Sequence, residues 1–297
     1  PYLGIVNEVL AQRMRTTYAI ADPFRELLDT RYLPNLPFNL PLDRTRSYLG
    51  HFARPFHEIL RIFDRGDRNV AQEVLGLSKE EFELLTTART SDADLYRAYG
   101  VPVPVGGPIV VVGGNFWQEL VRVDRFLVYS GLTRQALGHL LFQDLDAGEQ
   151  ARSQQREFFV NNVRDGALVI GAPVPMAIET VSVDPADVHE ELRNLSNPKL
   201  DRIHRFVRLA GKLGWAFEDL DWVLRSLGKT GSDQGIDEEA IVRLARIKRW
   251  HEQYKVPLDV LVAMWFDVKE TGRVNPDGRE PRDLFDRHIA RKWADRA

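Results

Sequence analysis

The sequence contains no cysteine among its 297 residues. This absence excludes disulfide bonds, thiolate metal sites and cysteine nucleophiles, but it leaves the cellular compartment open. No apolar run approaches the roughly 20 residues that a membrane-spanning helix needs. The longest candidate, residues 101–112, is interrupted by three prolines and two glycines. The formal charge of −3 is nearly balanced and the acids and bases are interspersed, so no field draws the chain towards nucleic acid or an anionic membrane.

The apolar content is 44%, which is enough for one large core or two modest ones. An amphipathic pattern begins directly after Pro1 and no signal peptide precedes it, so we expect the chain to be an excerpt of a longer polypeptide. We expect three parts, which together can form one continuous domain: an N-terminal helical part at 1–100, a helix pair with small hairpin insertions at 101–175, and C-terminal helix pairs at 176–297.

One pattern recurs four times along the chain, starting at Leu42, Leu120, Leu200 and Leu244. Counting the first leucine as offset 0, each copy has arginine at offset 2 and an aromatic residue at offset 6, and three copies have an aliphatic residue at offset 3. These offsets fall on one face of a helix. Apolar residues return at offsets 17, 20 and 21 after a turn signal, so each copy predicts a helix, a short turn and a second helix.

The third copy departs from this pattern at Asp221, where Trp222 takes the apolar role. We expect Asp219 and Asp221 to lie on an exposed helix rim. The spacing of the copies is uneven, which predicts inserted material between them. Ser78 and Glu81 form a capping box that opens a helix. Small β-hairpins are predicted at 101–112 and at 157–170. The fold class is therefore mainly α, an irregular array of repeated helix-turn-helix pairs with one or two small hairpin insertions.

The motifs of common enzyme sites are missing. The glycine-rich stretch at 106–114 lacks both the Gly-Lys-Ser/Thr of a phosphate-binding loop and the G-x-G-x-x-G spacing, so we interpret it as part of a hairpin. The seven histidines form no H-x-x-x-H or H-E-x-x-H pair, and no G-x-S-x-G elbow is present. The sequence predicts no catalytic residue, no cofactor and no metal. A hydrolase with a non-obvious site would need a deep pocket with a perturbed histidine or carboxylate pair.

The recurring arginines are candidates for structural or interface contacts. Arg44, Arg122, Arg202 and Arg246 stand at offset 2, and Arg125, Arg205 and Arg249 at offset 5. We expect their stems to cover the edge of the core and their guanidinium groups to pair with carboxylates on neighbouring helices or chains. Nucleic-acid binding is the alternative, which the interspersed acids weaken. The six tryptophans are expected to pack in the core, and Trp215 joins Arg44, Arg122, Arg202, Arg205 and Arg246 as a structural candidate.

Five stretches have sequence features more specific than the pattern of an ordinary amphipathic helix: residues 1–10, 37–42, 75–82, 126–132 and 200–221. In content and order they resemble the N-terminal helical shell of the A subunit of insecticidal toxin complexes (Tc toxins), the group that includes virulence plasmid A proteins. The block 200–221 is the most specific, and the resemblance runs from residue 1 to about residue 288. The stretch 101–112 departs from the family pattern.

The resemblance implies a large bacterial protein, secreted or held on the cell surface, that assembles as a homopentamer. In that family a helical shell surrounds a translocation channel and bears receptor-binding domains, and the B and C subunits carry the toxic enzyme. For this chain it implies a non-catalytic shell segment that contacts neighbouring protomers, without nucleic-acid binding and without a membrane span. The alternative is a host-receptor or glycan-binding module that uses the inserted hairpins.

The family's shell opens after a change of pH, and this makes His204 a candidate switch. His204 lies among Arg202, Arg205 and Arg208 in the sequence, so its protonation would add charge of the same sign.

Overall fold

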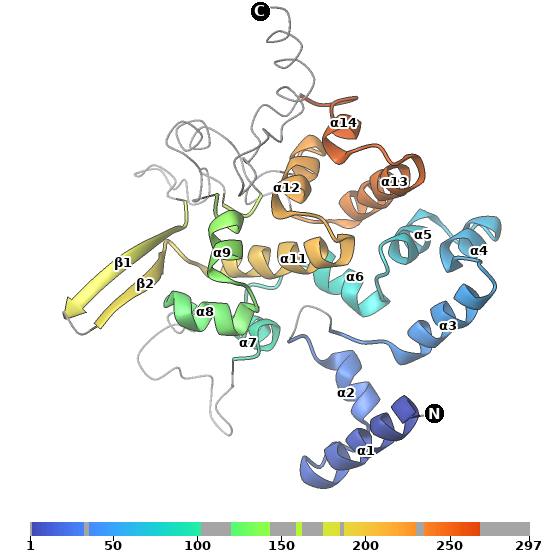
Figure 1. Cartoon of the computed structure of the whole chain (residues 1–297), viewed down its shortest axis with the longest axis horizontal. Coiled ribbons are helices and arrows are strands. Elements are labelled where there is room, and N and C mark those ends of the chain that lie inside the picture. The colour runs from blue at the N-terminus through green and yellow to red at the C-terminus, as the bar shows by residue number, and fades with distance from the viewer. Residues whose placement is uncertain are drawn as a thin grey trace, which may run out of the picture.

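The computed structural model describes residues 2–32, 36–101, 120–142, 159–161, 175–184, 187–229 and 235–267. Within these ranges the predicted fold class is confirmed: thirteen helices and one two-stranded antiparallel sheet (Figure 1). The helices before residue 101 are α1 (Tyr2–Thr17), α2 (Pro23–Asp29), α3 (Leu40–His51), α4 (Phe56–Ile62), α5 (Asp67–Val74), α6 (Lys79–Thr86) and α7 (Asp92–Tyr99). The later elements are α8 (Val123–Ser130), α9 (Arg134–Leu140), β1 (Ala177–Asp184), β2 (Asp187–Arg193), α11 (Asn197–Leu213), α12 (Phe217–Ser226), α13 (Glu238–Tyr254) and α14 (Leu258–Val262).

The four copies of the pattern become four helix pairs: α3/α4, α8/α9, α11/α12 and α13/α14. The turn signals act as predicted. Gly131 ends α8 in the left-handed conformation at φ +70°, and the hydroxyl of Thr133 accepts the amide of Ala136 at the start of α9. Gly214 ends α11 in the same conformation, which costs a glycine no side-chain clash. The capping box opens α6, with the Ser78 amide donating to Glu81 Oε2 at 2.8 Å and the Glu81 amide to Ser78 Oγ at 3.1 Å.

The hairpin lies at 177–193, where none was predicted. Its register sets Glu179 directly opposite Glu191, a like-charge pair that is unfavourable by itself. Arg193 offsets this repulsion, because its guanidinium reaches Glu179 Oε2 and Glu191 Oε2, each at 3.0 Å. The backbone amide of Leu192 donates to the carbonyl of Val121 at 2.7 Å, which joins β2 to the segment that enters α8.

The two predicted hairpins have different outcomes. In 101–112 only Val101 is described, so that prediction lies outside the described residues. In 157–170 only residues 159–161 are described, and they form a bend instead of a strand. At this bend the side chain of Asn161 bonds to two other segments: its amide donates to the carbonyls of Leu141 and Met176, each at 3.0 Å, and its oxygen accepts the Met176 amide.

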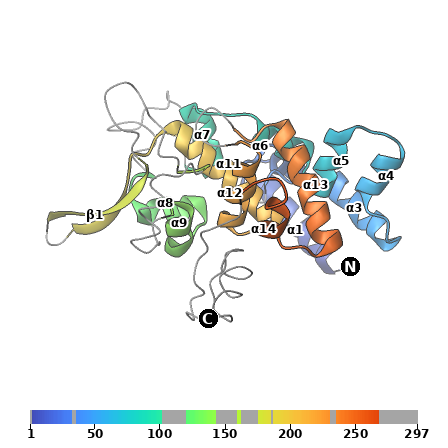
Figure 2. The ribbon, with the colours of Figure 1, turned by 90° about the horizontal axis from the view of Figure 1, so that it is seen from above.

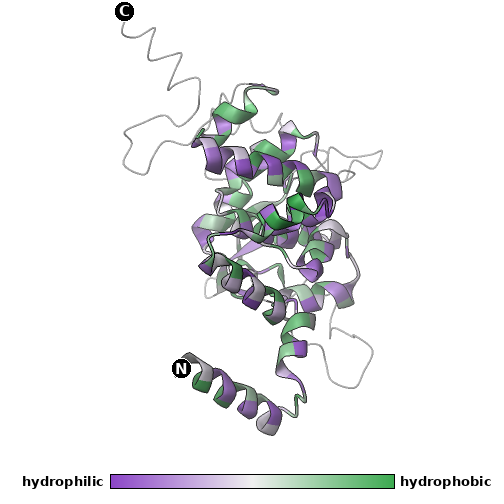
Figure 3. Ribbon diagram, turned by 90° about the vertical axis from the view of Figure 1, so that its right-hand side faces the viewer, coloured by the Kyte–Doolittle hydropathy of each residue, from purple (hydrophilic) through white to green (hydrophobic). Residues whose placement is uncertain are grey.

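Helix α11 lies at the centre of the described structure, with α6 and α7 packed on it and α12 folded back against it (Figure 1). One cluster of buried apolar residues extends from Ala71 to Val262. The hairpin projects at one end, and α3 and α4 lie at the other (Figure 2). At that end α5 packs against both α4 and α13. Helix α1 packs on α2 and stands away from the other helices, with Ile5, Val9 and Leu10 exposed (Figure 3).

The predicted buried face is correct for two of the four pairs. In α8/α9 and α11/α12 the patterned apolar residues are buried, apart from Phe217 at offset 17, which is partly buried. Helix α3 has no buried residue, and Tyr48 at its offset 6 is exposed. In α13 Leu244 and Ile247 are buried, whereas Trp250 at offset 6 is exposed. The pattern therefore marks a face that is able to pack, and burial depends on whether another helix pair covers it.

Candidate functional site

Helix α11 is buried on its polar side as well as on its apolar side. Its buried polar residues are Lys199, Asp201, Arg202, His204, Arg205 and Arg208. Pro198 in the first turn and Gly214 at the C-cap fix the two ends of this 17-residue helix. Because a buried charge without partners is strongly unfavourable, each of these groups must find its partner within the fold. This buried polar cluster is the candidate site.

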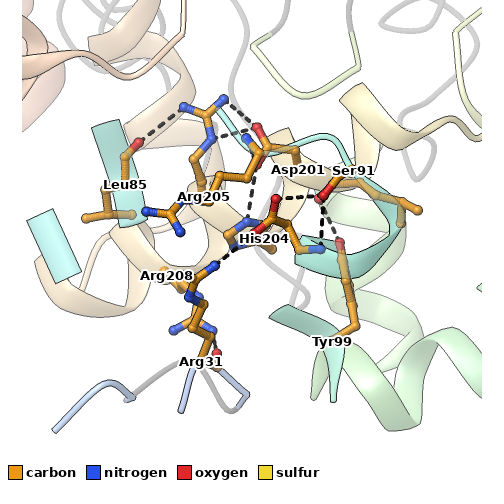
Figure 4. A network of polar contacts seen from close by, with 11 residues as sticks. Arg31, Leu85, Ser91, Tyr99, Asp201, His204, Arg205 and Arg208 are labelled. Carbon is orange, nitrogen blue, oxygen red and sulfur yellow. Dashed lines mark hydrogen bonds and ion pairs between the residues drawn. The ribbon is translucent and has the colours of Figure 1, made fainter. Parts of the chain in front are cut away.

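Asp201 is the centre of the cluster (Figure 4). One carboxylate oxygen accepts Arg205 Nε at 2.9 Å and lies 2.8 Å from Arg205 Nη2. The other accepts the backbone amide of Arg89 at 3.1 Å and lies 3.4 Å from His204 Nε2. One side chain on α11 thus binds the neighbouring turn of its own helix and the main chain that connects α6 to α7.

Three arginines of α11 donate to main-chain carbonyls of distant segments. Arg205 Nη1 donates to the carbonyl of Leu85, in the last turn of α6, at 3.1 Å. Arg202 Nη1 donates to the carbonyl of Phe159 at 3.3 Å. Arg208 donates to the carbonyls of Arg31 and Leu36, on the segment between α2 and α3. The carbonyls in the last turn of a helix and in an irregular segment have no backbone N–H partner within regular secondary structure. These cations therefore satisfy acceptors that would otherwise lie buried and unpaired.

The Arg208 guanidinium remains a cation despite its burial. Burial lowers the pKa of Arg208 to about 10, and the negative charge of Glu81 partly offsets that effect. Glu81 also holds Lys212 Nζ at 2.5 Å, so the capping box of α6 is linked to the last turn of α11. The cluster therefore carries positive charge at neutral pH and is held by carbonyl and carboxylate oxygens.

His204 is the histidine of the cluster. Its Nε2 faces Asp201, and its ring meets the ring of Tyr99 edge-on with centroids 6.3 Å apart. Burial lowers the pKa of His204; Asp201 raises it in part, and Arg208 and Arg205 lower it further. Its Nδ1 has no hydrogen-bond partner among the described residues.

Tyr99 closes the cluster on the side of α7. Its hydroxyl donates to the carbonyl of Leu200 at 2.9 Å, and burial raises its pKa well above the ordinary value. A cavity of about 20 Å³ lies next to it, large enough for about one water molecule. The cavity is lined by Ala98, Tyr99, Tyr129, Ser130, Ile203, His204, Val207 and Arg208. This space is far smaller than a pocket for an organic substrate.

The structure brings three of the predicted residues together and separates the others. Arg202, His204 and Arg205 meet in the cluster on α11. Arg44 is exposed on α3. The equal offsets therefore do not form one surface, because α11 is central while α3 lies at the edge of the described fold.

The remaining predicted residues lie elsewhere. Arg122 makes a two-point ion pair with Asp124, only two residues on, at 3.1 and 3.2 Å. Arg246 reaches Asp67 of α5 at 2.7 Å, a carboxylate on a neighbouring helix as predicted for this column. Trp215 is half-buried in the turn after α11 and meets the ring of His251 edge-on, with centroids 6.4 Å apart.

The sequence interpretation missed two residues that hold segments together. Arg46, at offset 4 of the first copy, donates twice to Glu73, at 2.8 and 2.9 Å, and to the carbonyls of Gly76 and Leu77. Asp221, predicted on an exposed rim, is buried and accepts the amide of Phe159 at 2.8 Å. Its departure from the apolar pattern was the available signal, since a lone carboxylate at a core position implies a buried donor.

The described residues contain no group of three or more histidine, aspartate and glutamate side chains placed to hold a metal ion. In the same part of the chain, no helix combines the length and the apolar character needed to cross a bilayer. Comparison with known proteins gives no match: no family model, no curated protein and no solved structure matches the chain.

Proposed function

We propose that the chain is a non-catalytic scaffold, a segment of the helical shell in the A subunit of an insecticidal toxin complex. The sequence resemblance over residues 1–288 supplies the family, and the helix pairs are the elements that such a wall needs, since a pair cannot bury its apolar face alone. In this role the chain surrounds a channel, contacts neighbouring protomers, and meets the B and C subunits only through the rest of the assembly.

The cluster on α11 is the observation that supports a scaffold most directly. The cations of Arg202, Arg205 and Arg208 bind main-chain carbonyls of three segments from other parts of the chain. A group that acts on a substrate needs access to it, whereas these groups are buried and bonded inward. Their chemistry is that of cross-links, which hold an irregular array of short helices in one arrangement.

Electron microscopy of the complete protein encoded by the gene tests the proposal. An epitope tag is inserted between β1 and β2, because this hairpin projects from the fold (Figure 1). We expect ring-shaped particles decorated by the tag antibody on their outer surface. A complete protein that is a single-domain monomer contradicts the proposal, as does an antibody that decorates only the channel axis. The same tag between Tyr254 and Leu258, which joins α13 to α14, is the second label that fixes the orientation of the chain in the particle.

A further inference from the structure

The cavity beside Tyr99 lies where two helices end against the middle of α11. Its wall on α7 is formed by Ala98 and Tyr99, and its wall on α8 by Tyr129 and Ser130, in each case the last two residues of the helix. The rest of the wall belongs to α11: Ile203, His204, Val207 and Arg208. The volume of about 20 Å³ admits about one water molecule and no organic ligand.

One ring nitrogen of His204 has hydrogen-bonding capacity that the described fold does not use. The other, Nε2, lies 3.4 Å from Asp201 Oδ1, and the histidine side chain is only 6% exposed (Figure 4). Asp201 also binds the guanidinium of Arg205. Because an ionised carboxylate only accepts hydrogen bonds, the proton of the neutral ring belongs on Nε2. Nδ1 is then an acceptor, and no described residue donates to it.

Two hydroxyl groups in the wall can bind a small molecule that also bonds to Nδ1. The hydroxyl of Ser130 accepts the Leu132 amide at 3.4 Å, which is its bond among the described residues, so its proton is available to another acceptor. The hydroxyl of Tyr99 donates to the carbonyl of Leu200 at 2.9 Å, and its oxygen keeps a lone pair. A buried water makes about three hydrogen bonds, and these three groups are sufficient for them.

The charges around the cavity favour a neutral occupant. The C-terminal ends of α7 and α8 meet there, and the negative ends of their dipoles disfavour an anion. Arg208, a buried cation, lines the same cavity and disfavours a second cation. Water is neutral, both donates and accepts hydrogen bonds, and matches the volume.

We propose that the cavity is a binding site for one structural water molecule, which donates to His204 Nδ1 and accepts from the hydroxyl of Ser130. The water connects the end of α8 to the centre of α11, and it stabilises the His204 tautomer that carries its proton on Nε2. The inference does not depend on the proposed scaffold function.

Nuclear magnetic resonance of the purified chain with isotope-labelled histidine tests the site at about pH 8, above the ordinary pKa of histidine. The chain has seven histidines, and His204→Gln identifies the ring signals that belong to His204. We expect a proton on Nε2, an Nδ1 chemical shift typical of a hydrogen-bonded acceptor, and a nuclear Overhauser effect between the ring and a water molecule.

Three variants with small changes in side-chain volume accompany this measurement. Ala98→Val places methyl groups in the cavity, so the water signal at His204 should be lost and the Nδ1 shift should move to that of an unbonded acceptor. Ser130→Ala removes one neutral hydrogen bond, so the water should be released about fivefold more readily and its signal should weaken. Ala136→Val changes a half-buried alanine on α9 that does not line the cavity, and it should leave the His204 signals unchanged.

Several results would overturn the inference. A proton on Nδ1, or no Overhauser effect to water in the unmodified chain, excludes the proposed site. So does an Ala98→Val or a Ser130→Ala variant that leaves the water signal unchanged; the latter decides the question if Ala98→Val does not fold. His204 signals that shift when bromide replaces chloride in the buffer would identify a bound anion instead.

Discussion

Asp201 and Arg205 lie one turn apart on α11 and form a two-point ion pair in which both side chains are at least 94% buried. An exposed pair of the same chemistry, Arg122 with Asp124, provides a matched comparison. Removing one partner of a buried ion pair leaves an uncompensated charge, which costs about 3–5 kcal/mol, whereas an exposed pair contributes about 0–1 kcal/mol.

The first prediction is that Asp201→Asn lowers the free energy of unfolding by about 3–5 kcal/mol, because Arg205 loses its carboxylate while it remains buried. Asp124→Asn should change the free energy of unfolding by less than about 1 kcal/mol. Urea unfolding followed by circular dichroism measures both. Equal losses for the two variants would mean that the buried cluster is not a principal stabilising element.

Gly100 provides the second prediction. It has φ +65°, and a Cβ atom added to it would lie 2.2 Å from Tyr32 Cγ. Gly131 has φ +70° with no atom within 4 Å of such a Cβ. Gly131→Ala should therefore cost about 1–2 kcal/mol from the backbone conformation alone. Gly100→Ala should cost that amount and about 1–3 kcal/mol more, because the ring of Tyr32 must move.

A double variant identifies the ring as the cause. If Tyr32 is the obstacle, Tyr32→Ala combined with Gly100→Ala should lose less stability than the sum of the two single changes, as measured by urea unfolding. Additive losses would show that the strain at Gly100 has another source.

The third prediction concerns the attachment of α3. Arg46→Gln removes charged hydrogen bonds to Glu73 and to the carbonyls of Gly76 and Leu77, bonds that are worth about 1.5–3 kcal/mol each when the donor is charged. Hydrogen exchange of the α3 amides should accelerate by about tenfold or more. Arg44→Gln, on the same helix but exposed, should leave exchange unchanged. Faster exchange in Arg44→Gln than in Arg46→Gln would show that Arg44, the recurring offset-2 arginine, anchors α3 instead.

The fourth prediction is a dependence of stability on pH. The pKa of His204 lies below its ordinary value of 6.5, first because of burial. Below pH 6.5 the unfolded chain therefore binds a proton that the folded chain resists, and the free energy of unfolding falls as the pH decreases through this range. The charged or titratable neighbours are Asp201, Arg205 and Arg208 on α11 and Tyr99 on α7.

His204→Gln should flatten this decrease. If the chain is a shell segment as proposed, the same change should lower the pH at which the shell opens. The pKa of His57 is also lowered by burial, but His57 is only half-buried, so His57→Gln should flatten the decrease less. Urea unfolding at a series of pH values compares the variants. An unchanged slope for His204→Gln, together with an unchanged opening threshold of the proposed shell, would rule out His204 as the candidate pH switch.

Local signals in the sequence predicted most of the helical fold. The leucine, arginine and aromatic spacing identified four helix pairs, and Ser78 with Glu81 identified the start of α6, because both features depend on residues within a few positions of each other. The hairpin at 177–193 was missed because Glu179, Glu190 and Glu191 obscure the alternation of apolar and polar residues that indicates a strand. The compensating bonds of Arg193 and Arg134 become visible only in three dimensions.

The candidate site was predicted only in part, for a related reason. Arg202 and Arg205 were noticed through their spacing, but their partners, the carbonyls of Phe159 and Leu85, belong to distant segments that no sequence pattern connects to α11. Asp201 lies three and four positions before His204 and Arg205, so that local pairing was readable and was missed. The exposure of Tyr48 and Trp250 could not be predicted, because the same motif surrounds the buried Phe126 and Phe206. Burial at these positions depends on which helix pairs become neighbours.

The bonds that α11 makes have a consequence for the order in which the chain folds during synthesis. They link residues far apart in sequence: Asp201 to Arg89 across 112 positions, Arg205 to Leu85 across 120, and Arg208 to Leu36 across 172. A ribosome produces α1 to α7 long before it reaches residue 213. During that time these helices lack the bonds that the charged side chains of α11 make in the folded chain. Contacts over such separations close slowly. The N-terminal half can therefore form its bonds to α11 only after α11, which ends at residue 213, has emerged from the ribosome.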